Sequence, residues 1–148
     1  MHILDQQAPG VARRLRSLSV DQRRRIVGRA CELVSQSIGD LDRPLRELLG
    51  TIRSECALSA GDVEEARSLA EQADESYFSL KEEGAEESLW MRCFARARLL
   101  TGIAFAFGGE NWKDAADGLY ELFACREDAT ELLELVQFEL DAAGAKKE

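Results

Sequence analysis

The chain holds a single histidine, His2, and only two prolines among its 148 residues. Without a second histidine, a serine or cysteine nucleophile has no obvious neighbouring base, so Ser-His and Cys-His catalysis find no support. His2 lies at an end of the chain that we expect to fray, which argues against a catalytic or metal-binding role. With 45% apolar residues and so few prolines, the chain has enough material for a buried core and is not expected to be disordered.

Metal and cofactor motifs are missing as well. The sequence has no Cys-x-x-Cys pair, no H-E-x-x-H or Glu-x-x-His helix and no EF-hand loop, so the common zinc, di-iron and calcium sites are not predicted. Gly108 and Gly109 lack the further glycines and the lysine of a phosphate loop. We therefore predict no catalytic residue, no metal site and no cofactor. The four cysteines are expected to be buried, reduced thiols: Cys31, Cys56, Cys93 and Cys125.

Long apolar runs are absent too. The longest uncharged apolar run, residues 99–107, is nine residues long, whereas a membrane-spanning helix needs about 18 or more. The first five residues do not show the basic region and apolar core of a signal peptide. We expect a soluble, cytoplasmic protein that does not bind membranes.

The charge is negative and unevenly distributed. The chain carries 28 acidic and 19 basic residues, a formal net charge of −9, which argues against general nucleic-acid binding. Residues 1–53 nevertheless have a net charge of +4, so the remainder has −13. No aromatic residue lies among Arg23, Arg24, Arg25 and Arg29 to stack on bases. These arginines are predicted to pair with acidic helices of the same chain or to face water.

The hydrophobic pattern predicts helices throughout. Apolar side chains recur at helical spacing between capping residues and glycines in six stretches: 19–38, 42–52, 59–80, 86–107, 111–123 and 128–140. Residues 11–16 could add one short helix, and no window alternates like a strand. The predicted fold class is all-α, a single compact bundle or hairpin array of about five or six helices. Residues 1–148 are expected to form one domain, with 1–18 and 144–148 loosely ordered.

One stretch shows a family resemblance. Small and aromatic residues flank a turn within residues 97–127: Gly102, Ala104, Phe105, Gly109, Trp112, Ala115 and Leu119. This stretch resembles a single tetratricopeptide-type helical hairpin, with a turn one residue longer and no second copy at that family's period of about 34 residues. A generic antiparallel helix pair with small contact residues explains the same pattern. The resemblance implies a groove for a peptide or a partner helix, and no catalysis.

Acidic residues gather on and after the stretch 59–80. Glutamates lie opposite its predicted alanine-rich buried seam and continue beyond its end, and two aromatic residues lie among them. The predicted partner-binding residues are Glu64, Glu71, Glu75, Tyr77, Phe78, Glu82, Glu83, Glu86 and Glu87. An acidic face with an aromatic anchor suits a basic protein partner, because charges steer the encounter and the ring supplies buried area. The alternative is a solvated helix surface that only keeps the protein soluble.

These features favour a non-catalytic protein-binding module. Such a module could neutralise a basic toxin, as bacterial toxin-immunity proteins do. One alternative is a chaperone or adaptor that holds a partner helix or peptide. Another is a helical domain with a small-ligand pocket between the alanine-rich helix and the region of Trp90 and Trp112. The predicted partner is a basic protein rather than a nucleic acid or a membrane, and the sequence is compatible with homo-oligomers.

Overall fold

The computed structural model describes residues 2–6, 8–39, 41–55, 57–125 and 128–145, and all regular structure in these ranges is helical. A 3₁₀ turn, η1 (Ile3–Gln6), precedes seven α-helices: α1 (Val11–Arg16), α2 (Val20–Ile38), α3 (Arg43–Arg53), α4 (Ala60–Glu82), α5 (Glu87–Gly108), α6 (Trp112–Phe123) and α7 (Thr130–Ala145). The all-α prediction is confirmed. The prediction of about five or six helices is too low, because these ranges contain seven α-helices. The additional one is the short helix α1, which packs through its buried Leu15.

Capping side chains define where the helices begin. Ser19 Oγ accepts the Gln22 backbone N–H at 3.1 Å, and Gln22 Oε1 accepts the Ser19 N–H at 3.0 Å. Ser59 and Asp62 form the same reciprocal pair at the start of α4, with both distances 3.0 Å. These capping boxes satisfy backbone donors that a helix leaves unpaired in its first turn. The predicted helix starts at residues 19 and 59 are confirmed.

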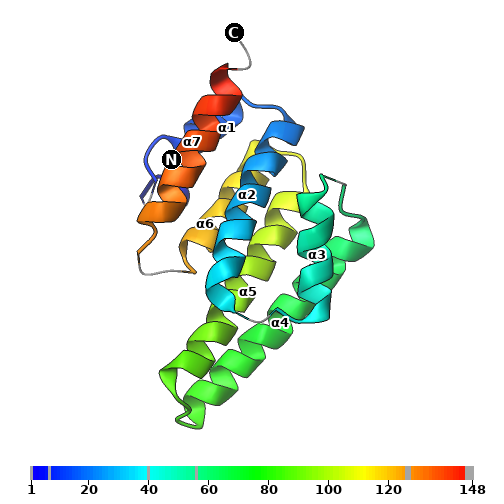
Figure 1. The fold of residues 1–148 in the computed structure, drawn as a ribbon, viewed down its shortest axis with the longest axis vertical. Helices are drawn as coiled ribbons and strands as arrows, with labels where there is room; N and C mark the ends of the chain where they lie inside the picture. Colours follow the sequence, from blue (N-terminus) through cyan, green and yellow to red (C-terminus); the bar gives the residue numbers. More distant parts are fainter. Residues whose placement is uncertain (1, 7, 40, 56, 126–127, 146–148) are drawn as a thin grey trace.

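Helix α2 occupies the centre of the helical array, and α5 and α6 pack against it with α3 and α7 nearby (Figure 1). The predicted buried faces of α2 and α3 are confirmed, including Val27 and Val34 on α2 and Leu45 on α3. On α4, the buried seam consists of Val63, Ala66, Ala70 and Ala73. Because alanine seams let helices approach closely, α4 lies along α5 for most of its length.

The N-terminal segment packs onto α6. Leu4 is fully buried, and His2 Nε2 lies 2.5 Å from Asp117 Oδ1 while its Nδ1 accepts the Leu4 backbone N–H at 3.0 Å. The His2 ring also lies against Trp112, with ring centroids 6.2 Å apart. The expectation that His2 frays is therefore wrong, because hydrogen bonds and an aromatic contact hold it on α6. Residues 1, 7 and 146–148 lie outside the described part, and loose order there stays a prediction.

Candidate functional site

The far half of the α4–α5 pair extends beyond the ends of the neighbouring helices (Figure 1). We call residues 74–94 the arm: the end of α4, the turn at 83–86 and the start of α5. Gly84 adopts a φ of 75° in that turn, which a residue without Cβ accepts without strain. The core cluster ends at Ala70 on α4 and begins again at Leu99 on α5, and none of residues 74–94 is fully buried. The arm is therefore held mainly by its own contacts.

An aromatic cluster holds the two helices of the arm together. The Tyr77 ring centroid lies 5.7 Å from that of Trp90 and 5.4 Å from that of Phe94, so α4 and α5 meet through these rings. The Lys81 ammonium lies 5.2 Å from the Trp90 ring centroid. Aromatic pairs of this kind contribute about 0.5–1.5 kcal/mol each beyond the area they bury. Tyr77 is thus half-buried at the centre of the cluster and shapes the arm from within.

The neighbouring apolar side chains face water. Phe78 is 59% exposed although its ring lies 5.1 Å from that of Tyr77, and Leu89 is 47% exposed. Trp90 and Phe94 are half-buried, whereas their spacing predicted a buried stripe. The reason is that the arm projects past the other helices, so only α4 covers this part of α5. Sequence reasoning did not select Leu89, which follows the polar residues Glu86, Glu87 and Ser88.

The predicted acidic residues all lie exposed. We call the following set the acidic face: Glu64, Glu71, Glu75, Glu82, Glu83, Glu86 and Glu87. The last five belong to the arm, whereas Glu64 lies on the first turns of α4, about 27 Å from Glu82 at 1.5 Å per residue. Glu64 pairs with Arg67 on its own helix. Among the described residues, the other six glutamates form no ion pair.

A partly buried ion-pair network lies at the base of the arm. Arg98 of α5 contacts Glu121 of α6 at 2.7 Å and Asp74 of α4 at 3.3 Å, and its guanidinium lies 5.8 Å from the Phe94 ring centroid. The side chain of Arg98 is 23% exposed and that of Glu121 is 13% exposed. One side chain therefore links α4 and α5, which form the arm, to α6.

The arginines of the N-terminal third are largely paired within the chain. Arg25 Nε lies 3.8 Å from Glu55, Arg29 Nε 3.8 Å from Glu139, and Arg53 Nε 3.3 Å from Glu32. Internal pairing is confirmed, but these carboxylates lie on other elements than α4. The acidic face is therefore not neutralised by the basic third of the chain.

Arg23 and Arg24 are held differently, by backbone oxygens. The Nη2 atom of Arg23 donates to the carbonyl of Glu110, and that of Arg24 donates to the carbonyl of Gly109, both at 3.3 Å. These carbonyls follow the C-terminal end of α5, which favours nearby cations. The contacts compensate for the placement of two arginines near the N-terminus of α2.

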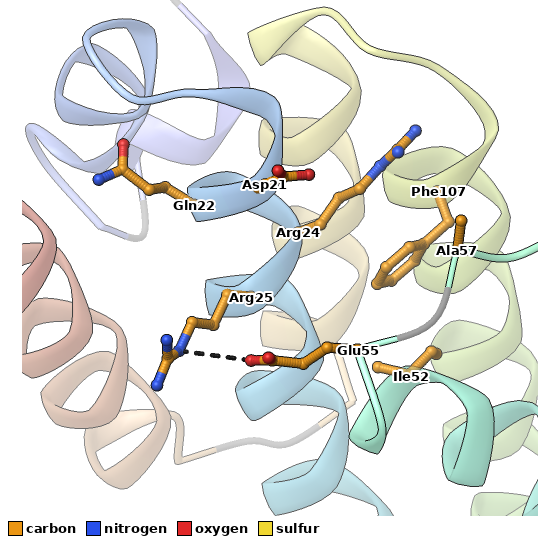
Figure 2. Close-up of a pocket in the computed structure, with 8 residues that line it drawn as sticks. All are labelled: Asp21, Gln22, Arg24, Arg25, Ile52, Glu55, Ala57 and Phe107. Atoms are coloured by element: carbon orange, nitrogen blue, oxygen red, sulfur yellow. Dashed lines mark ion pairs between the residues drawn. The ribbon is translucent and has the colours of Figure 1, made fainter.

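A pocket of about 350 Å³ opens between α2, the end of α3 and the end of α5 (Figure 2). It is lined by Asp21, Gln22, Arg24, Arg25, Ile52, Glu55, Ala57 and Phe107. Neither Trp90 nor Trp112 lines it. This cavity is therefore not the pocket predicted beside those tryptophans, which stays a prediction; Trp112 packs on the N-terminal segment and Trp90 on Tyr77.

Buried thiols do not form a reactive site. Cys31 and Cys125 are buried and Cys93 is half-buried, while Cys56 lies outside the described residues. Burial, with a smaller contribution from the nearby Cys125, raises the pKa of the Cys31 thiol far above its usual value. The thiol is therefore protonated at neutral pH and a poor nucleophile. In the described part of the chain, no group of three or more His, Cys, Asp or Glu side chains could hold a metal ion.

Across the described ranges, no helix combines the length and apolar character that crossing a membrane requires. Comparisons of the chain with protein-family models, with curated proteins and with solved structures give no match.

Proposed function

We propose that the protein is a non-catalytic binding module whose arm docks onto a basic segment of a partner protein. The observation that carries the proposal is the exposed Phe78 ring among unpaired glutamates on a projecting helical hairpin. Residues 74–94 have six acidic and two basic side chains, a net charge of −4 within one small element. Many protein interfaces combine an aromatic side chain that contributes much of the binding energy with surrounding charges that steer the encounter.

The half-buried and the exposed apolar residues of the arm have different roles, and this difference supports the proposed function. The half-buried Tyr77 and Trp90 rings fix the two helices, so Phe78 and Leu89 are presented on a preorganised surface. Preorganisation reduces the entropy lost on binding. The unpaired Glu75 and Glu82 lie one turn before and one turn after Phe78 on the same helix face. A partner that covers Phe78 with an apolar side chain would meet these carboxylates with lysine or arginine.

The biological role that we infer is neutralisation of a basic toxin, in the manner of bacterial toxin-immunity proteins. The size, helical fold and acidic arm support it. The immediate test is capture of the partner from a native lysate with the full chain as bait. Wild type should retain a basic protein that the variant Glu75→Lys/Glu82→Lys loses. The control variant Glu110→Lys/Glu134→Lys makes the same charge change away from the arm and should retain it.

A chaperone or adaptor role is the second candidate, and the exposure of Phe105 favours it. Phe105 is 44% exposed on α5, within the α5–α6 pair that resembles a tetratricopeptide-type hairpin in sequence. An apolar site of that kind would bind extended peptides in high salt, since its contacts are not ionic. The Phe105→Ser variant should then lose the bound protein while Phe78→Ser keeps it. The opposite result supports the arm.

A further inference from the structure

We propose that the pocket between α2, the end of α3 and the end of α5 binds a small organic anion with a largely apolar body. At about 350 Å³, the cavity lies at the lower end of the range of small-ligand sites, about 300–1,000 Å³. This binding activity is independent of the arm, because no residue of 74–94 lines the cavity.

The apolar part of the ligand has defined contacts. Ile52 at the end of α3, Ala57 before α4 and Phe107 at the end of α5 face the cavity from one side (Figure 2). Phe107 is half-buried and packs against the core, so its ring is already fixed in place. A flat aromatic or short aliphatic body can cover these three side chains without opening the core. Burying such surface contributes about 25 cal/mol per Å².

Arg24 indicates that the ligand carries a negative charge. Its Nη2 donates to the Gly109 carbonyl, and the described residues offer its guanidinium no carboxylate within ion-pair distance. Its Nε is buried and has no hydrogen-bond partner among them. Arg24 lines the cavity, so an anionic oxygen of a ligand there would give its guanidinium the ion-pair partner that the described residues do not supply.

Arg25 lies on the same edge of the cavity. Its Nε lies 3.8 Å from Glu55 Oε1, longer than a hydrogen bond, so this contact is loose (Figure 2). A ligand oxygen can therefore compete with Glu55 for Arg25. A smaller pocket of about 90 Å³ shares Arg24, Arg25, Ile52 and Glu55 with the cavity and adds Arg29 and Arg53 to its lining. Four arginines thus line the two adjoining pockets, compared with three acidic residues, Asp21, Glu32 and Glu55. The lining therefore carries a net positive charge.

The test uses a matched pair of fluorescent probes on the full chain. The anion is 8-anilinonaphthalene-1-sulfonate, and its uncharged counterpart is N-phenyl-1-naphthylamine. Wild type should bind the sulfonate saturably at one site. Arg24→Gln and Arg25→Gln should each weaken sulfonate binding about tenfold, the usual effect of losing a charged hydrogen bond, and leave the uncharged probe nearly unaffected.

A second variant tests the location of the site by filling it. Ala57 is exposed at the mouth of the cavity, so Ala57→Phe adds a ring there without entering the core. It should abolish binding of both probes, whereas Ser76→Phe on the exposed face of α4 and Arg46→Gln on α3 should not. Circular dichroism and thermal unfolding check that each variant folds.

The proposal is overturned if wild type shows no saturable binding, or if Ala57→Phe binds as wild type does. Loss of binding in Phe78→Ser would also overturn it, because the probe would then bind the arm. Equal weakening of both probes by Arg24→Gln would exclude an anion site.

Discussion

Gly102 of α5 and Gly118 of α6 lie against each other where the two helices pack, and neither position has room for a side chain. A Cβ on Gly118 would lie 2.8 Å from the Gly102 carbonyl oxygen and 2.7 Å from the Ala106 Cβ. A Cβ on Gly102 would lie 3.0 Å from the Gly118 carbonyl oxygen. Backbone thus meets backbone at this contact, which fixes how closely α6 approaches the helix that continues into the arm.

This contact predicts that Gly118→Ala destabilises the protein, although alanine favours helices. Overpacking against backbone costs about 1–3 kcal/mol in free energy of unfolding, more than the helix propensity gained. Gly50→Ala is the matched control, because Gly50 lies within α3 and a Cβ there meets nothing within 4 Å. That variant should be about 0.5–1 kcal/mol more stable than wild type. Denaturant unfolding measures both, and equal shifts for the two variants would contradict the close contact.

Glu55 at the edge of the pocket is predicted to be strained. Its φ of 60° lies in the left-handed region, which costs a residue with a side chain about 1–2 kcal/mol. Glu55→Gly and Glu55→Ala both remove the carboxylate that faces Arg25, but only glycine relieves the backbone. The glycine variant should therefore unfold with a free energy about 1 kcal/mol higher than the alanine variant. If alanine is equally stable, the strain is absent.

The network at the base of the arm predicts unequal effects of two arginine substitutions. Arg98→Met leaves Asp74 and the largely buried Glu121 without their cation, so we expect a loss of about 1–3 kcal/mol in unfolding free energy. Arg43→Met removes a pair in which both side chains are mostly exposed, and should change stability by less than about 0.5 kcal/mol. Hydrogen exchange should accelerate across residues 74–94 in Arg98→Met alone. Unchanged exchange there would mean that the network does not anchor the arm.

Thiol labelling tests the burial of the core of α2. Because burial raises the pKa of Cys31, its thiolate fraction stays small even when the pH rises from 7 to 9. Iodoacetamide should therefore leave Cys31 unmodified in the native protein at both pH values and modify it in denaturant. Cys93, which is half-buried, should be modified faster. Peptide mass spectrometry distinguishes the sites, and native labelling of Cys31 would contradict its burial.

The sequence predicted the local elements well, because their causes are local. The start of the stretch 19–38 and its apolar spacing depend on residues within one helix, and the structure confirms both. The contact between His2 and Asp117 spans 115 positions and depends on how α6 packs, which periodicity does not contain.

The candidate site shows the same limit. The unpaired glutamates were visible as a cluster in the sequence, but the exposure of Phe78 and Leu89 follows from the projection of the arm beyond the bundle. The pocket joins residues from α2, α3 and α5 with the segment before α4, and no sequence window brings them together. The charged cluster could therefore be predicted from the sequence, whereas the exposure of its apolar neighbours and the pocket could be found only from the tertiary structure.

The most direct test of the arm is the salt dependence of its association with the captured partner. We predict that wild type associates several-fold faster in about 50 mM than in about 300 mM salt, because unpaired glutamates steer the encounter. Glu75→Lys/Glu82→Lys should associate slowly at both concentrations, and Glu110→Lys/Glu134→Lys should behave nearly as wild type. If the arm variant keeps the wild-type rate and salt dependence, the acidic arm is not the docking surface.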